Sequence, residues 1–159
     1  MNDEQYNSIK GELERICENC LYSAQAYFEA AKSADFWGRL MVFIPACISA
    51  LAGFMSALNK TPTWGALSAV AGAVAATASF LGATKKAADF QSSARSYTAL
   101  RHRVQLQLGL LAKEDAWEEA RETLRSANDA YVQIVTTDMP VTNRAFNIAR
   151  KRIQQGMAS

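Results

Sequence analysis

Apolar residues in the first part of the chain recur at steps of three and four, the period of a helix with one apolar face. No proline interrupts the chain between Asp3 and Ile44. The pattern therefore predicts one long amphipathic helix over about 3–36, and nothing in the sequence stops it at the apolar block that follows. Its stripe is formed by Tyr6, Ile9, Leu13, Ile16, Cys17, Cys20, Leu21, Ala24, Tyr27, Phe28 and Ala31.

The block 40–84 differs because it is apolar on every side of a helix. It is 45 residues long and Lys60 is its only charged residue. Turn-forming residues at 59–63 divide it into two uncharged halves of 20 and 24 residues. About 20 helical residues cross the hydrocarbon layer of a bilayer, so the block predicts a transmembrane hairpin. The alternative, a soluble helical core, requires the rest of the chain to cover both helices, and it stays open.

The segment 85–159 returns to the amphipathic pattern and predicts three more helices. The first runs to about Ala112, and the second starts after Asp115, which with Glu118 matches a capping box. Pro140 separates a short basic helix at the end. No strand-like alternation is present, so the predicted fold is all-α. The three apolar stripes are Phe90, Ala94, Tyr97, Leu100, Val104, Leu108 and Leu111; Trp117, Ala120, Leu124, Ala127, Tyr131 and Ile134; and Phe146, Ala149 and Ile153.

Charge predicts how the hairpin is oriented. Residues 1–39 carry four basic and seven acidic side chains, and residues 85–159 carry twelve basic and eight acidic ones. Basic residues flank the block on both sides, whereas its turn holds only Lys60, so the positive-inside rule places both arms in the cytoplasm and the turn outside. The chain opens without the apolar stretch of a secretory signal, which fits a cytoplasmic N-terminal arm.

Candidate catalytic or metal-binding residues are few. His102 is the only histidine and lies between two arginines, which is typical of a solvated helix surface. Cys17 and Cys20 form a C-x-x-C pair, but a zinc site needs further ligands that the sequence does not supply, and both cysteines belong to the apolar stripe. We therefore expect no enzymatic activity, no metal and no cofactor.

Small residues form a stripe on each half of the apolar block. In membranes such stripes let helices approach closely, and hydroxyl groups can bond across the contact. The stripes predict either the packing contact of one hairpin or, in a homo-oligomer, the wall of a pore. No ionisable group lies within the spans, which argues against a proton relay. The residues are Ala46, Ser49, Gly53 and Ser56 in the first half and Gly65, Ser68, Gly72, Ala76 and Ser79 in the second.

Three segments together resemble the SLATT-domain family. SAQAYFEAAKSADFWGRLMVFIPACISALAG is similar to the family's entry into its first span, and ASFLGATKKAADFQSSARSYTALRHRVQ is similar to its exit from the second. MPVTNRAFNIARKRI resembles the closing proline and short helix, so the likeness covers nearly the whole chain. The matching positions are Tyr27, Phe28, Ala30, Ala31, Ala87, Tyr97, Leu100, Arg101 and Arg103.

The resemblance implies a single domain with cytoplasmic helices at 1–39 and 85–159 around a transmembrane hairpin at 40–84. It implies an effector of bacterial anti-phage defence in the inner membrane, which forms an oligomeric pore and causes abortive infection. The implied trigger is a partner encoded nearby, either a nucleotide second-messenger synthase or a reverse transcriptase. A non-conducting membrane scaffold that recruits a partner enzyme is the alternative. Direct binding of a nucleotide or nucleic acid stays open.

Overall fold

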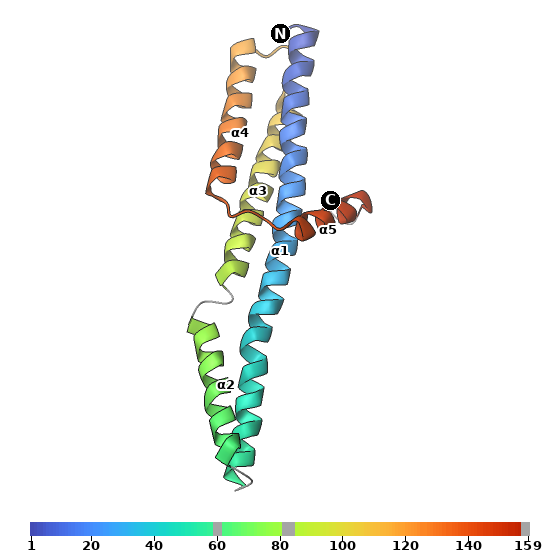
Figure 1. Ribbon diagram of the computed structural model, residues 1–159. Coiled ribbons are helices and arrows are strands. Elements are labelled where there is room, and N and C mark those ends of the chain that lie inside the picture. The colour runs from blue at the N-terminus through green and yellow to red at the C-terminus, as the bar shows by residue number, and fades with distance from the viewer. Residues whose placement is uncertain (59–61, 81–84, 157–159) are drawn as a thin grey trace. The chain divides into compact units, whose positions relative to one another are not determined.

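The computed structural model describes residues 1–58, 62–80 and 85–156. Over these residues the chain is all-helical, as the sequence pattern predicts, and it forms five helices (Figure 1). The predicted turn at 59–63 falls largely on 59–61, outside the described residues. The helices are α1 (Asp3–Ala57), α2 (Pro62–Phe80), α3 (Lys85–Leu110), α4 (Trp117–Thr137) and α5 (Asn143–Gln154).

Two compact units make up the structure. The first, here called the bundle, comprises residues 1–30 and 90–159, and the second, here called the hairpin, comprises residues 31–89. The predicted long N-terminal helix is confirmed, and it continues to Ala57 without a break. The first part of α1 therefore belongs to the bundle and its remainder to the hairpin.

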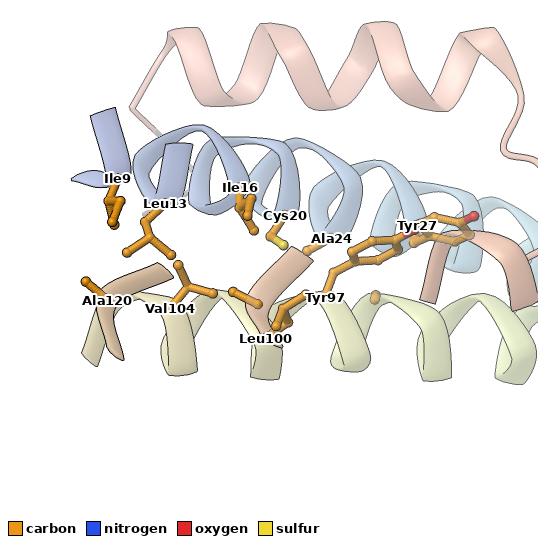
Figure 2. Packing of buried hydrophobic residues seen from close by; sticks show 12 residues of the cluster. Ile9, Leu13, Ile16, Cys20, Ala24, Tyr27, Tyr97, Leu100, Val104 and Ala120 are labelled. Atoms are coloured by element: carbon orange, nitrogen blue, oxygen red, sulfur yellow. The ribbon is translucent and has the colours of Figure 1, made fainter. Parts of the chain in front are cut away.

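The bundle packs around the apolar stripes of α1, α3 and α4. Ile9 and Leu13 of α1 are fully buried, Leu13 points toward Val104 of α3, and Cys20 lies further along the same face of α1 (Figure 2). The stripes predicted for α3 and α4 are confirmed, because their members are buried or pack against the core, and so is the stripe of α1 except at Tyr6 and Leu21, which are only half-buried. The central cluster is Ile9, Leu13, Ile16, Cys20, Ala24, Tyr27, Ala94, Tyr97, Leu100, Val104, Ala120 and Ala127.

Aromatic rings connect the three helices at one end of this core. The rings of Tyr27 on α1 and Tyr97 on α3 stack with centroids 5.5 Å apart, and Tyr131 on α4 lies 6.2 Å from Tyr97. Aromatic pairs of this kind contribute about 0.5–1.5 kcal/mol beyond the area they bury. These tyrosines therefore fix how α1, α3 and α4 pack against one another.

The predicted cap of α4 is wrong. Ala116, not Asp115, is the N-cap residue, and no side chain caps the helix. The Oδ2 atom of Asp115 instead accepts a hydrogen bond from the backbone N–H of Ala112, at 2.8 Å. That bond closes the connection between α3 and α4, while Glu118 and Glu119 in the first turn complement the helix dipole.

The break at Pro140 is confirmed, because α4 ends at Thr137 and α5 begins at Asn143. Polar contacts attach this part of the chain to the bundle: the Tyr27 hydroxyl donates to the carbonyl of Met139 at 2.7 Å, and Arg152 pairs with Glu29 at 2.6 Å.

The apolar face predicted for α5 is wrong in one position. Ala149 is buried, but Phe146 is 47 % exposed, because α5 packs through its small residues.

Candidate functional site

The hairpin carries its large apolar side chains on the outside. Leu51 is 67 % exposed, and Phe54 and Val70 are almost equally exposed. Soluble domains bury most side chains of this kind, and a large exposed apolar surface marks contact with a membrane or a partner. The hairpin's exposed large hydrophobic residues are Phe36, Trp37, Met41, Phe43, Ile44, Ile48, Leu51, Phe54, Leu58, Leu67, Val70 and Val74.

Among the described residues, α1 is the one helix long and apolar enough to cross a membrane. Only 6 % of its most apolar 18-residue window is buried inside the structure. The described parts of the chain therefore leave this segment uncovered, unlike the core helix of a soluble protein. The second predicted span, 61–84, is described only over 62–80, and its crossing stays a prediction.

Two serines hold the helices of the hairpin together. The Ser49 hydroxyl on α1 donates to the backbone carbonyl of Ser68 at 3.0 Å, and the Ser68 hydroxyl on α2 donates to the carbonyl of Ser49 at 2.9 Å. Because each hydroxyl bonds to the backbone of the other helix, the two groups satisfy one another without water. Interhelical hydrogen bonds of this type contribute about 0.6 kcal/mol on average in membranes.

Glycines lie opposite serine hydroxyls on either side of this pair. A Cβ atom added to Gly72 would lie 3.3 Å from the Ser49 Oγ atom, and one added to Gly53 would lie 3.4 Å from the Ser68 Oγ atom. Gly65 meets Ser56 in the same way, at 3.3 Å. Small residues thus allow the two backbones to approach closely along an antiparallel contact, which we call the seam: Ser49, Gly53, Ser56, Gly65, Ser68 and Gly72.

The structure does not bring every predicted small residue to the seam. Ala46, Ala76 and Ser79 are exposed on the hairpin. Sequence reasoning also missed Ala52 and Ala71, which are the most deeply buried alanines of the two apolar helices. The helical period could have located both alanines, because each follows a seam serine by three residues and so lies on the same face of its helix. Whether any of these small residues lines a pore stays a prediction.

The family-like positions outside the hairpin lie mostly in the bundle core. Tyr27, Tyr97 and Leu100 are buried there, and Phe28 packs against the same core. Burial, and after it the negative charge of Asp138, raises the pKa of Tyr27 to about 12 and raises that of Tyr97 further. Both phenols therefore stay neutral in the physiological range. The two arginines differ, because Arg101 is half-buried and Arg103 is exposed.

The C-x-x-C pair is part of the same core. The Cys17 thiol donates to the carbonyl of Arg101 at 3.8 Å, and Cys20 is fully buried. Burial raises the pKa of both thiols, that of Cys20 to about 12, so both are protonated at neutral pH. Metal ions bind the thiolate form. Over the described ranges, no group of three or more His, Cys, Asp or Glu side chains is placed to hold a metal.

Comparison with protein-family models, with curated proteins and with solved structures finds no match for this chain. The SLATT resemblance therefore rests on its residues alone, and the functional argument rests on the hairpin.

Proposed function

We propose that the hairpin crosses the bacterial inner membrane twice. The observation that carries this proposal is the apolar window of α1, of which only 6 % is buried. Burying a large apolar side chain is worth about 1.5–3 kcal/mol in water, so leaving many of them exposed there is costly. In lipid the same surface costs nothing. The exposed Leu67, Val70 and Val74 on α2 extend the argument to the second span.

The proposed orientation has both arms in the cytoplasm and the turn outside. Lys32 and Arg39 lie before or at the start of the first span, and Lys85 and Lys86 follow the second. A cytoplasmic excess of lysine and arginine beside short loops favours this orientation. It places the bundle in the cytoplasm, where a triggering partner could reach it.

We propose further that several copies assemble into a pore that disrupts the inner membrane, as the SLATT resemblance implies. One helix pair cannot enclose a channel, so conduction requires a homo-oligomer. The seam serines and glycines are already used inside the hairpin. Contacts between copies, or a pore wall, are therefore left to the exposed small residues Ala46, Ala76 and Ser79 and to the large apolar side chains.

Carbonate extraction tests the membrane proposal, because an integral hairpin stays in the pellet and a soluble oligomer is released. Topology is then read by labelling single cysteines in a variant carrying Cys17→Ala, Cys20→Ala and Cys47→Ala. Lys60→Cys should react from outside the cell, and Ser92→Cys only after permeabilisation. Labelling of both positions from the same side would contradict the hairpin.

Dye release from liposomes separates the pore from the scaffold. Purified protein in vesicles, with the neighbouring gene product and its nucleotide product added, should release a small dye as a pore. Oligomers that insert fully and never release dye under these conditions would support the non-conducting scaffold instead.

A further inference from the structure

The hairpin contains a groove of about 810 Å³ beside its seam. Its walls come from α1 and α2, including Met41, Val70 and Val74, and one residue at the start of α3, Lys86. Thr77 also contributes, but its hydroxyl is engaged by the carbonyl of Ala73 at 2.8 Å. The groove is therefore apolar along its length and carries a single charge.

The antiparallel seam places that charge at one end. Gly53 lies opposite Ser68 and Gly65 lies opposite Ser56, so the later residues of α2 run alongside the earlier residues of α1. Lys86 therefore lies at the same end of the groove as Trp37. This is the end nearer to the charged residues Lys32 and Asp35 of α1. Tryptophan and lysine are the side chains that gather at the membrane–water interface.

The Lys86 ammonium group has no ion-pair partner among the described residues. On α1, the carboxylate of Asp35 forms an ion pair with Arg39 instead, with Nη2 and Oδ2 2.9 Å apart. The groove thus presents one unpaired positive charge at its polar end, next to a long apolar surface.

We propose that this groove binds an anionic phospholipid of the cytoplasmic leaflet, with one acyl chain along Met41, Val70 and Val74 and the phosphate on Lys86. This inference rests on the membrane insertion proposed above. The volume falls within the range of roughly 300–1,000 Å³ that is usual for ligand sites. Basic pockets between membrane helices on the cytoplasmic side are suited to anionic headgroups. A polar ligand would find Lys86 as the one charged residue on walls that are otherwise mostly apolar.

The test is native mass spectrometry of the full chain in mild detergent, titrated with phosphatidylglycerol and, separately, with phosphatidylcholine. Lys86→Gln should weaken phosphatidylglycerol binding about fivefold, because this is the affinity that one lysine contributes near an anionic lipid surface. Lys85→Gln is the matched control, since Lys85 is exposed and does not line the groove, and its binding should change less than twofold. Phosphatidylcholine should bind more weakly and respond to neither change.

A second variant fills the groove. Val74→Trp should reduce phosphatidylglycerol binding at least tenfold, while Leu67→Trp, on the same helix and outside the groove, should leave it unchanged. Equal binding by Lys86→Gln and Lys85→Gln, or by Val74→Trp and the parent, would overturn the lipid site.

A change of oligomer size in Val74→Trp without lipid loss would assign the groove to a second copy and also overturn the lipid site. Carbonate extraction of each variant keeps the two proposals apart, because a protein that stays in the membrane and loses no lipid contradicts only this inference.

Discussion

The bundle and the hairpin bury different kinds of side chain. The bundle buries large residues such as Leu13 and Val104 as well as small ones such as Ala94. In the apolar helices of the hairpin the most deeply buried residue is Ala52, at 1 % exposure, and its neighbour Leu51 faces outward. One chain thus follows two packing rules.

The difference is the one expected if water surrounds the bundle and lipid surrounds the hairpin, as proposed above. In water, burial of large side chains drives helices together, so the period of those side chains locates the core. In lipid that force is absent between helices, and close backbone approach and interhelical hydrogen bonds replace it. The reciprocal Ser49–Ser68 bonds and the facing glycines fit the second rule.

The sharpest test removes a large apolar side chain from each unit. Leu13→Ala should lower the free energy of unfolding of the bundle by about 2–5 kcal/mol, because Leu13 is fully buried and its loss leaves a cavity. Leu51→Ala should change stability in detergent by less than about 0.5 kcal/mol. Unfolding followed by far-ultraviolet circular dichroism, which reports the helices of both units, measures both. Equal destabilisation would erase the contrast between the units.

The next test adds a side chain instead of removing one. Gly72→Leu should disturb the seam by about 1–3 kcal/mol, because even a Cβ atom meets the Ser49 hydroxyl at 3.3 Å. This shifts the equilibrium between the packed and the separated helix pair by about five- to a hundredfold. Titration with sodium dodecyl sulfate, which reports helix association, is the measurement.

The bundle supplies the control for this change. Gly109 has open space around it, with no atom within 4 Å of an added Cβ, so Gly109→Leu should be harmless. If Gly72→Leu costs no more than Gly109→Leu, the close approach at Gly72 does not hold the two helices of the hairpin together.

A smaller effect is expected for the serine pair. Ser68→Ala removes one hydroxyl donor and leaves the Ser49 hydroxyl its carbonyl acceptor, so the cost should be about 0.6 kcal/mol and at most about 1.7 kcal/mol. Ser96→Ala on α3 is the control, since its hydroxyl bonds only within its own helix at an exposed position. Titration with sodium dodecyl sulfate reports helix association. A cost matching that of Ser96→Ala would show that the hydroxyl pair contributes nothing to the seam.

The last test leaves stability untouched and compares the native cysteines. Cys47 is exposed on the hairpin, whereas Cys20 is buried in the bundle. In membranes a charged maleimide should label neither Cys47 nor Cys20, because lipid covers the first, protein covers the second, and a thiol reacts only as the thiolate. Mass spectrometry counts the labels. Rapid reaction of Cys47 with the charged reagent would mean that water, not lipid, covers this face.

The same two rules explain what the sequence could predict. The bundle stripes, such as Ile9, Leu13 and Ile16, stand out because large and polar residues alternate with the helical period. The seam is harder to predict, because small residues occur on every face of the block and Ala52 does not differ from its exposed neighbour Ala50. The cap predicted at Asp115 failed for another reason. A capping box is recognised from local spacing alone, and in the structure the Asp115 carboxylate accepts a hydrogen bond from the Ala112 N–H instead of capping α4.

The hydrogen bond between Tyr27 and Met139 has a consequence for how the protein is made. These residues are 112 positions apart, whereas Ser49 and Ser68 are separated by 19. At roughly 5–20 residues per second, translation adds about 6–22 seconds between the two ends of the longer contact. The apolar block is therefore synthesised before α4, and during this interval α1 has no α4 to pack against. On the topology proposed above, the hairpin enters the membrane before the bundle core closes.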